Sequence, residues 1–498
     1  MIETRRFPDK WLYFPILALA SILLIKLIQF SKIIHYFPLH IMADSPDHIS
    51  KIHFLAQYGF HGLVPNWYNG FILFQSYPPC YYYFSLPFYL LTNNILLTTY
   101  VSLILSFVLG FIGVFIFCKL QKISLVKTIA FFFFLFANPI LIGYFAEIGR
   151  LAAVFTWLVV FVPFCTVIFW YKDHKIDLKF ILFIIFLSAL ILSHTFVLIP
   201  TTVLIISLFL IKNKYEKIII SLSTFFSLLI TSFWWIPFLK ISLSGDRIAG
   251  HLAAELLKLP SFISYNTLIL LLFWVTLYFY LKDKHKSKEI LFFLPLLIFS
   301  ILFFSRLIVF VPLFNRMPAG PYNLFFLFLP IFLFFKTRFS IYPLIIKKLI
   351  FLGLALLAIG SIIVVIIQMS DFPIEYNEIE EEIISVFPQI QNKFTILVNE
   401  KEGFPSDVEA LVAYASIYYN LSSPHGHYGP AARKEVSNTL DELDEHFKMK
   451  DCGAILLDLK KLYVKEVISI DKHCDFLSSC NLKQEIKKQH VCLFSLSD

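Results

Sequence analysis

The sequence predicts an α-helical polytopic membrane protein that ends in a small α/β domain. Of its 498 residues, 58% are hydrophobic and only 15% are charged, whereas soluble domains carry about 25% charged residues. Apolar stretches alternate with short basic loops as far as residue 370, and charged residues become frequent from 371 onward. The alternation predicts a multi-span membrane domain over 1–370, and the change in composition predicts a soluble extracytoplasmic domain over 371–498.

Apolar runs bounded by basic loops give the number of spans. Crossing the hydrocarbon core takes about 20 apolar residues, and this rule predicts about eleven transmembrane helices. The predicted spans are 11–32, 96–118, 127–145, 150–171, 180–194, 195–211, 218–237, 262–281, 289–311, 322–335 and 348–369. The segment 81–91 is too short to span and contains Pro87, so we expect an interfacial or re-entrant helix there.

Lysine and arginine residues gather in alternate loops. The clusters are Lys119, Lys122 and Lys127; Lys172, Lys175 and Lys179; Lys212, Lys214 and Lys217; Lys282, Lys284, Lys286 and Lys288; and Lys336, Arg338, Lys347 and Lys348. Because basic loops stay on the cytoplasmic side, this pattern predicts a multi-pass protein of the cell (plasma) membrane with its N-terminus inside and its C-terminus outside. The first apolar segment has no small-residue cleavage site, so we expect it to remain as an anchor. The net charge of +8 reflects topology, and we expect no nucleic acid partner.

The unusual polar residues fall on the outer side of this topology. The first outer loop, 33–80, is long and contains Asp44, Asp47, His48, Trp67 and Tyr77. The later outer loops contain Glu147, Arg150, His194, Lys240, Arg247 and Arg316. Polar groups at membrane depth are costly and normally face a cavity or one another. Their collection on one side predicts a single outward-facing site.

The stretch 41–53, IMADSPDHISKIH, contains the densest group of these residues. Ser45 fits an N-cap, Pro46 fits the first helical position, and Asp47 favours the positive end of the helix. This local explanation leaves Asp44 and His48 unexplained. A carboxylate at a membrane surface serves either as a general base toward an acceptor hydroxyl or as a ligand to a divalent metal such as Mg or Mn. Both roles are open for Asp44.

The order of motifs in the first outer loop resembles a known superfamily. The loop reads ADSPDHISKIHFLAQYG and then LVPNWYNGFILFQSYPPCYYYFSLPFYLL. An early Asp, a Trp and a Tyr-Pro-Pro turn before a helix resemble the GT-C membrane glycosyltransferases, which use polyprenyl-phosphate sugars. The spacing D-x-x-x-H, P-x-W and Y-P-P-x-Y-Y is similar to a branch labelled "6-pyruvoyl-tetrahydropterin synthase-related" membrane proteins. The segments EIGRLAAVF, LSHTF, SFWWIPFL and NRMPAGPYNLFFLFLP extend the resemblance. The sequence has no His-rich zinc signature of a soluble pterin synthase, so we expect no pterin chemistry.

The resemblance implies transfer of a sugar from a polyprenyl-phosphate-linked donor to a glycan, lipid or protein acceptor at the outer membrane face. It makes Asp44 the base or metal ligand, with Asp47 and His48 beside it. Arginine suits the leaving phosphate because its planar fork binds phosphate oxygens in pairs. The candidates for lipid-phosphate and substrate binding are Arg150, Arg316, Glu147, His194, Arg247, Lys240, Trp67 and Tyr77.

Structural alternatives stay open for several of these residues. Arg150 can pair with Glu147 on one helix face, and Arg316 can extend its charge to the membrane surface from a helix end. His194 can serve as a structural hydrogen bonder, and Trp67 and Tyr77 as interface anchors. At the level of the whole protein, the alternative to an enzyme is a non-catalytic GT-C-like scaffold, or a transporter or flippase of lipid-linked sugars.

Four of the seven cysteines lie in the predicted soluble domain. Cys474 and Cys480 can pair outside the membrane, although the sequence alone does not determine the connectivity. A zinc site using His473 and His490 matches no common ligand spacing. Asn420-Leu-Ser is a glycosylation sequon, which agrees with an outer location.

Overall fold

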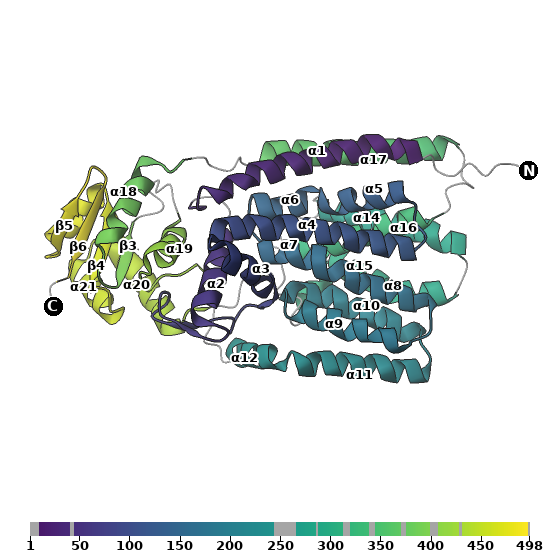
Figure 1. Ribbon diagram of the computed structural model, residues 1–498, viewed down its shortest axis with the longest axis horizontal. Helices are drawn as coiled ribbons and strands as arrows, with labels where there is room; N and C mark the ends of the chain where they lie inside the picture. The colour runs from purple at the N-terminus through teal and green to yellow at the C-terminus, as the bar shows by residue number, and fades with distance from the viewer. Residues whose placement is uncertain are drawn as a thin grey trace, which may run out of the picture.

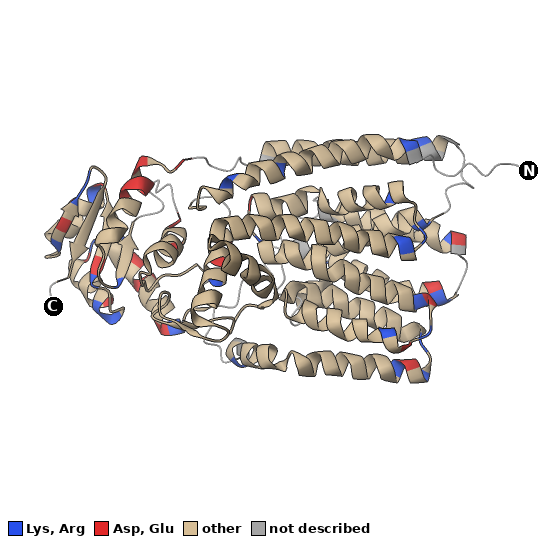
Figure 2. Cartoon of the chain, in the orientation of Figure 1, with Lys and Arg blue, Asp and Glu red and all other residues tan. Residues whose placement is uncertain are grey.

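The computed structural model describes residues 9–39, 44–243, 265–284, 287–311, 319–337, 344–369, 375–398, 407–427 and 431–496. A long bundle of apolar helices leads into a smaller C-terminal region that contains the main sheet (Figure 1). The first helix begins at the end of the bundle that lies farthest from this sheet (Figure 1). Charged side chains are sparse along the middle of the bundle, and lysine and arginine gather at the end away from the sheet (Figure 2).

Helices overlap every predicted span, but the described helices at 180–194, 195–211 and 322–335 are too short to count as full spans, so the prediction of about eleven transmembrane helices is too high for the described residues. The bundle comprises α1 (Tyr13–Phe30), α4 (Ile95–Leu120), α5 (Leu125–Phe136), α6 (Pro139–Ala146), α7 (Leu151–Phe155), α8 (Val162–Asp173), α9 (Ile181–Ile191), α10 (Leu198–Ile211), α11 (Lys214–Ile230), α12 (Ser232–Leu243), α14 (Tyr265–Lys284), α15 (Ser287–Phe304), α16 (Ala319–Lys336) and α17 (Leu344–Gln368). Within the described ranges, five helices are long and apolar enough to cross a membrane, or seven if each bent pair is one span. The chain is therefore a polytopic helical membrane protein.

The bend between α5 and α6 leads the chain to the loop that carries Arg150. The pair α5 and α6 is bent by 55°, because the chain starts a new helix at Asn138. The Asn138 side chain accepts hydrogen bonds from the backbone N–H groups of Ile140 and Leu141, and Pro139 occupies the first turn, where its missing N–H is tolerated. The short helix α6 then ends at Ala146, directly before the loop that carries Arg150.

The segment between α1 and α4 covers the end of the bundle that faces the C-terminal region (Figure 1). It contains α2 (Ser45–Tyr58), the two-stranded pair β1 (Leu63–Val64) and β2 (Phe71–Ile72), and α3 (Cys80–Thr92). Helix α2 begins one residue earlier than the sequence predicts: Asp44 takes the N-cap position, Ser45 is the first helical residue, and the Asp44 side chain makes no capping bond. The prediction of Ser45 as the N-cap is therefore wrong by one position, since Asp44 is an equally favoured N-cap type, and its carboxylate makes no capping bond because it binds Arg150.

The C-terminal region is a small α/β unit, as the sequence predicts. It consists of α18 (Glu378–Val386), β3 (Phe394–Leu397), α19 (Val408–Tyr419), α20 (Lys434–Met449), α21 (Cys452–Lys461), β4 (Glu466–Ile470), α22 (Lys472–Ser479), β5 (Lys483–Lys487) and β6 (Val491–Ser495). The four strands are ordered β3-β4-β6-β5, with β3 parallel to β4 and the other pairs antiparallel. Strand β4 is buried along its whole length, which explains its apolar sequence.

Two disulfides connect the helices of this region to each other and to the sheet. Cys452 pairs with Cys480, and Cys474 pairs with Cys492, with Cα–Cα distances of 5.1 and 5.9 Å. The predicted pairing of Cys474 with Cys480 is therefore wrong. These residues lie six positions apart along α22 and its end, and each has a nearer partner on another element.

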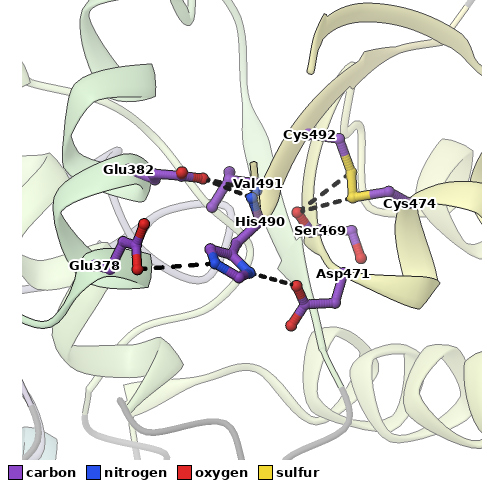
Figure 3. Close-up of polar contacts among 8 residues, drawn as sticks. All are labelled: Glu378, Glu382, Ser469, Asp471, Cys474, His490, Val491 and Cys492. Carbon is purple, nitrogen blue, oxygen red and sulfur yellow. Dashed lines mark hydrogen bonds and ion pairs between the residues drawn. A yellow bond between two sulfur atoms is a disulfide. The ribbon is translucent and has the colours of Figure 1, made fainter. Parts of the chain in front are cut away.

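His490 joins α18 to the sheet (Figure 3). Its Nδ1 lies 2.8 Å from Asp471 Oδ1, and its Nε2 lies 3.9 Å from Glu378 Oε2. The Glu382 carboxylate accepts hydrogen bonds from the backbone N–H groups of His490 and Val491, at 2.9 and 3.0 Å. Helix α18, the first helix after the bundle, is thereby held against β6.

Candidate functional site

The site lies where the first outer loop meets the C-terminal region. Trp67 is fully buried at this junction, and its indole N–H donates to Ser416 Oγ at 3.1 Å. The Asn66 side-chain amide donates to Asn420 Oδ1 at 3.1 Å, and the Ser423 N–H donates to the Asn66 carbonyl at 2.8 Å. Helix α19 packs on α2 (Figure 1). With no ring face exposed, Trp67 joins the two parts of the chain rather than forming a platform for a sugar.

Asp44 and Arg150 form an ion pair at this end of the bundle. Arg150 Nε donates to Asp44 Oδ2 at 2.9 Å, and the Asp44 backbone N–H donates to the Ile148 carbonyl at 2.8 Å. The Asp44 side chain is 41% exposed and the Arg150 side chain 35%. Tyr144 lies against the same guanidinium, with its ring centroid 5.8 Å from Cζ. A guanidinium has five N–H donors, so the pair leaves part of this cation accessible to a ligand.

The backbone around Gly149 gives Arg150 its position. Gly149 has a φ of +79°, which an L-residue rarely adopts, and the Arg150 N–H donates to the Tyr144 carbonyl at 2.6 Å. Glu147 is exposed at the C-cap of α6, and Arg150 precedes α7, so the two residues do not share a helix face. In the described structure Arg150 pairs with Asp44 rather than with Glu147.

Asp47 forms a second, fully buried ion pair with Lys51. Lys51 Nζ lies 2.6 Å from Asp47 Oδ2, and the two side chains are 2% and 5% exposed. The residues stand four apart on α2, where side chains face each other. Lys51 Nζ also lies 4.3 Å from the centroid of the Tyr77 ring. Asp47 is thus neutralised inside the protein, in contrast to the accessible Asp44.

His48 lies at the centre of an aromatic cluster. Its Nδ1 is 2.8 Å from the Tyr82 hydroxyl, and the rings of Tyr77, Tyr81 and Tyr82 lie 5.7 to 6.0 Å from the imidazole. Burial lowers the pKa of His48 well below its ordinary value, and the nearby Lys51 lowers it further. His48 is therefore a neutral imidazole near pH 7, suited to hydrogen bonding and not to carrying charge.

His194 comes to the same cluster from the turn between α9 and α10. Its ring lies 6.2 Å from that of Tyr77. Burial, with a smaller effect of Arg150, lowers the pKa of His194 to about 3, so it too is neutral. The structure thus brings together five of the predicted site residues with Arg150: Asp44, Asp47, His48, Tyr77 and His194.

The remaining predicted residues lie elsewhere. Lys240 is exposed on α12, and no described contact joins it to Asp44 or Arg150. Arg247 and Arg316 lie outside the described residues. Sequence reasoning gave no role to Tyr82, Tyr144 or His427, which all contact or surround the cluster. For His427 the signal was the motif PHGHYGP, which concentrates histidine, glycine and proline in one short stretch.

The described residues do not provide a metal-ligand set. Among them, no group of three His, Cys, Asp or Glu side chains is placed to hold a metal ion. Asp44 is bonded to Arg150, Asp47 to Lys51 and His48 to Tyr82. A divalent metal at Asp44 therefore stays a sequence prediction, and the chemistry proposed below uses none.

Comparisons with known proteins give the class of fold. No family model and no curated protein matches the sequence. Among solved structures, the oligosaccharyltransferase AglB from Archaeoglobus fulgidus, in complex with an inhibitory peptide and a dolichol-phosphate, matches with a TM-score of 0.57 and 11% identity over 91% of this chain and 69% of that one. The arabinofuranosyltransferase AftD from Mycobacteria matches with a TM-score of 0.59 and 12% identity over 100% of this chain and 40% of that one. An AglB complex with Zn and sulfate matches with a TM-score of 0.54 and 12% identity over 90% and 68%.

At these identities the likeness concerns the fold. The chain resembles these membrane glycosyltransferases in fold, with a small C-terminal sheet region. The finer resemblance to the branch labelled pterin synthase-related stays a prediction.

Proposed function

We propose that the protein is a membrane glycosyltransferase that moves a sugar from a polyprenyl-phosphate-linked donor to a glycan, lipid or protein acceptor. The reaction takes place at the end of the bundle that carries α2, on the outer face of the plasma membrane. The observation that carries this proposal is the accessible Asp44–Arg150 ion pair at that end of a GT-C fold. The C-terminal region, packed against the same end, lies where an acceptor would approach.

Each member of the pair has one task in the transfer. An acceptor hydroxyl oxygen attacks the anomeric carbon of the donor sugar, and the bond between that carbon and the phosphate oxygen breaks. Asp44 accepts the proton of the attacking hydroxyl, as a general base does. Arg150 stabilises the negative charge that develops on the departing polyprenyl phosphate. When the phosphate engages Arg150, it competes with Asp44 for the cation and leaves the carboxylate freer to accept a proton.

Buried groups cannot perform these tasks. Asp47 is already paired with Lys51 in a dry environment, and His48 is neutral and hydrogen-bonded to Tyr82. Both residues instead hold the first turns of α2, and this fixes the position of Asp44 at the start of the helix. We therefore assign catalysis to Asp44 and positioning to Asp47 and His48.

Sugar transfer from labelled donors tests the proposal. Purified protein in nanodiscs is offered polyprenyl-phosphate sugars, and wild type is compared with Asp44→Asn, Arg150→Gln and the control Asp173→Asn. Asp173 is an exposed carboxylate at the C-terminal end of α8. We expect Asp44→Asn to lower kcat by about 10²–10⁴-fold, and Asp173→Asn to behave as wild type. Full activity of Asp44→Asn would contradict the assignment, and inactivity of wild type with every donor would favour the scaffold or flippase alternative.

A further inference from the structure

Several buried polar atoms around His48 have no hydrogen-bond partner among the described residues. They are Asp47 Oδ1, Tyr81 Oη, His194 Nδ1 and His427 Nε2. Native proteins satisfy nearly all buried polar groups, and each exception calls for a ligand, a water molecule or a functional reason. Four exceptions around one imidazole indicate a binding site for a polar ligand.

Short distances and ring contacts place Asp47, Tyr81 and His194 around the same imidazole. Asp47 Oδ2 lies 3.9 Å from His48 Nδ1, and the Tyr81 ring lies 6.0 Å from the His48 ring. His194 packs edge-on against Tyr77, whose ring lies 5.7 Å from that of His48. His194 and His427 also lie close enough to His48 to contribute to the lowering of its pKa. The four groups come from α2, α3, the α9–α10 turn and the C-terminal region.

The C-terminal region brings His427 to the cluster through a tightly seated segment. The Tyr68 hydroxyl donates to the Gly426 carbonyl. A Cβ on Gly426 would lie 2.7 Å from the Tyr68 ring and 2.9 Å from Trp67 Cβ, so only glycine fits here. The His427 side chain is 6% exposed, and its Nε2 lies 3.7 Å from Asp407 Oδ2, beyond hydrogen-bonding distance. His427 is therefore held in place with hydrogen-bonding capacity unused.

The chemistry of the cluster favours neutral hydroxyl groups over phosphate. His48 and His194 are uncharged, and the one carboxylate among the four groups is already paired with Lys51. Aromatic walls with a few convergent polar groups are typical of sites that bind small molecules. The donor phosphate does not need this cluster, because Arg150 provides a cation for it. The cluster is thus complementary to the sugar part of a donor whose phosphate lies at Arg150.

We propose that His194 and His427 bind hydroxyl groups of the transferred sugar and determine which sugar is transferred. This inference rests on the proposed function and extends it, because it gives the C-terminal region a direct part in donor selection. A site that hydrogen-bonds a substrate hydroxyl discriminates strongly against an analogue that lacks it, since its own polar groups are then left unpaired. Removal of the recognising imidazole removes that discrimination.

Deoxy analogues of the donor test the inference. Citronellyl-phosphate sugars, with each ring hydroxyl in turn replaced by hydrogen, are assayed with wild type, His194→Asn, His427→Asn and the control His425→Asn. His425 stands two residues before His427 in the same segment, and its Nε2 is likewise buried without a described partner, but no described contact joins its side chain to the groups around His48. We expect wild type to prefer the complete sugar by 10-fold or more in kcat/KM over at least one deoxy analogue. His427→Asn and His194→Asn should each reduce one such preference to less than 3-fold, and His425→Asn should retain it.

Two results would overturn the inference. One is an equal loss of rate with every donor in the His427 variant, because that pattern indicates a structural role or ordered water only. The other is an unchanged preference in both variants. If wild type transfers no sugar at all, the proposed function fails by itself, and equilibrium binding of the same citronellyl-phosphate sugars, read by tryptophan fluorescence, decides the inference. Equal affinity of wild type for complete and deoxy sugars would then refute it.

Discussion

Replacement of Lys51 by methionine tests the balance of charge beneath the site. Lys51 Nζ and Asp47 Oδ2 lie 2.6 Å apart with both side chains buried. With an effective dielectric constant of about 20, their attraction amounts to about 6 kcal/mol, most of which offsets the cost of removing two charges from water. Lys51→Met leaves Asp47 buried and unpaired, and we expect it to lower the free energy of unfolding by about 3–5 kcal/mol.

The double variant Asp47→Leu/Lys51→Met shows whether Lys51→Met loses stability through the unpaired Asp47 charge or through altered packing. Replacing both charges by apolar side chains of similar size is often neutral or stabilising, so we expect the double variant to be at least as stable as Asp47→Leu alone and near wild type. The measurement is denaturant-induced unfolding in detergent, followed by tryptophan fluorescence and by retention of a monodisperse peak. A double variant as unstable as Lys51→Met would refute the view that the unpaired Asp47 charge causes the loss.

Three further predictions concern the C-terminal region. The Asp471 hydrogen bond raises the pKa of His490. The stability that protonated His490 contributes is therefore fully present below its unfolded pKa of about 6.5, and it is lost as pH rises through the raised folded-state pKa. Limited proteolysis between pH 5.5 and 8.5 should show this loss in wild type and not in His490→Gln. Gly426→Ala should weaken docking by about 1–3 kcal/mol because Tyr68 must move, and hydrogen exchange should rise in α19 while the sheet stays protected; unchanged exchange would contradict the tight fit. The four paired cysteines, Cys452, Cys474, Cys480 and Cys492, should react with a membrane-impermeant maleimide on intact cells only after reduction; labelling only after the cells are opened would contradict the outer location.

The sequence was sufficient to predict the helices, but not the contacts between residues that lie far apart in the chain. Apolar length and basic loops predicted where the helices of the bundle lie, but they overcounted the spans, since five of the described helices, or seven with the bent pairs, are long enough to cross a membrane. The Asp47–Lys51 pair follows a local spacing of four residues and is readable from sequence. The Asp44–Arg150 pair joins residues 106 positions apart, and no local pattern encodes such a distance. The start of α2 was misplaced by one residue because Asp44 and Ser45 are both favoured N-cap types, and the local sequence does not choose between them.

The C-terminal region shows the same limit. Alternating apolar and polar runs predicted a small α/β unit, but cysteine spacing could not give the connectivity, because pairing depends on which helix packs on which strand. Trp67 offered two interpretations from sequence, and only the position of Ser416, 349 residues later, places it inside an interface. His427 was overlooked because its neighbours in the site come from the other end of the chain.

The junction between Trp67 and Ser416 also sets an order of events during synthesis. The outer loop leaves the ribosome 349 residues before the helix that covers it, which at about 5–20 residues per second is a wait of about 17–70 s. Through that interval Phe54 and Phe71 already pack on the indole, but its N–H has no acceptor and the face of α2 that α19 covers stays open. A chain that stops before α19 therefore lacks the junction that holds the C-terminal region against α2.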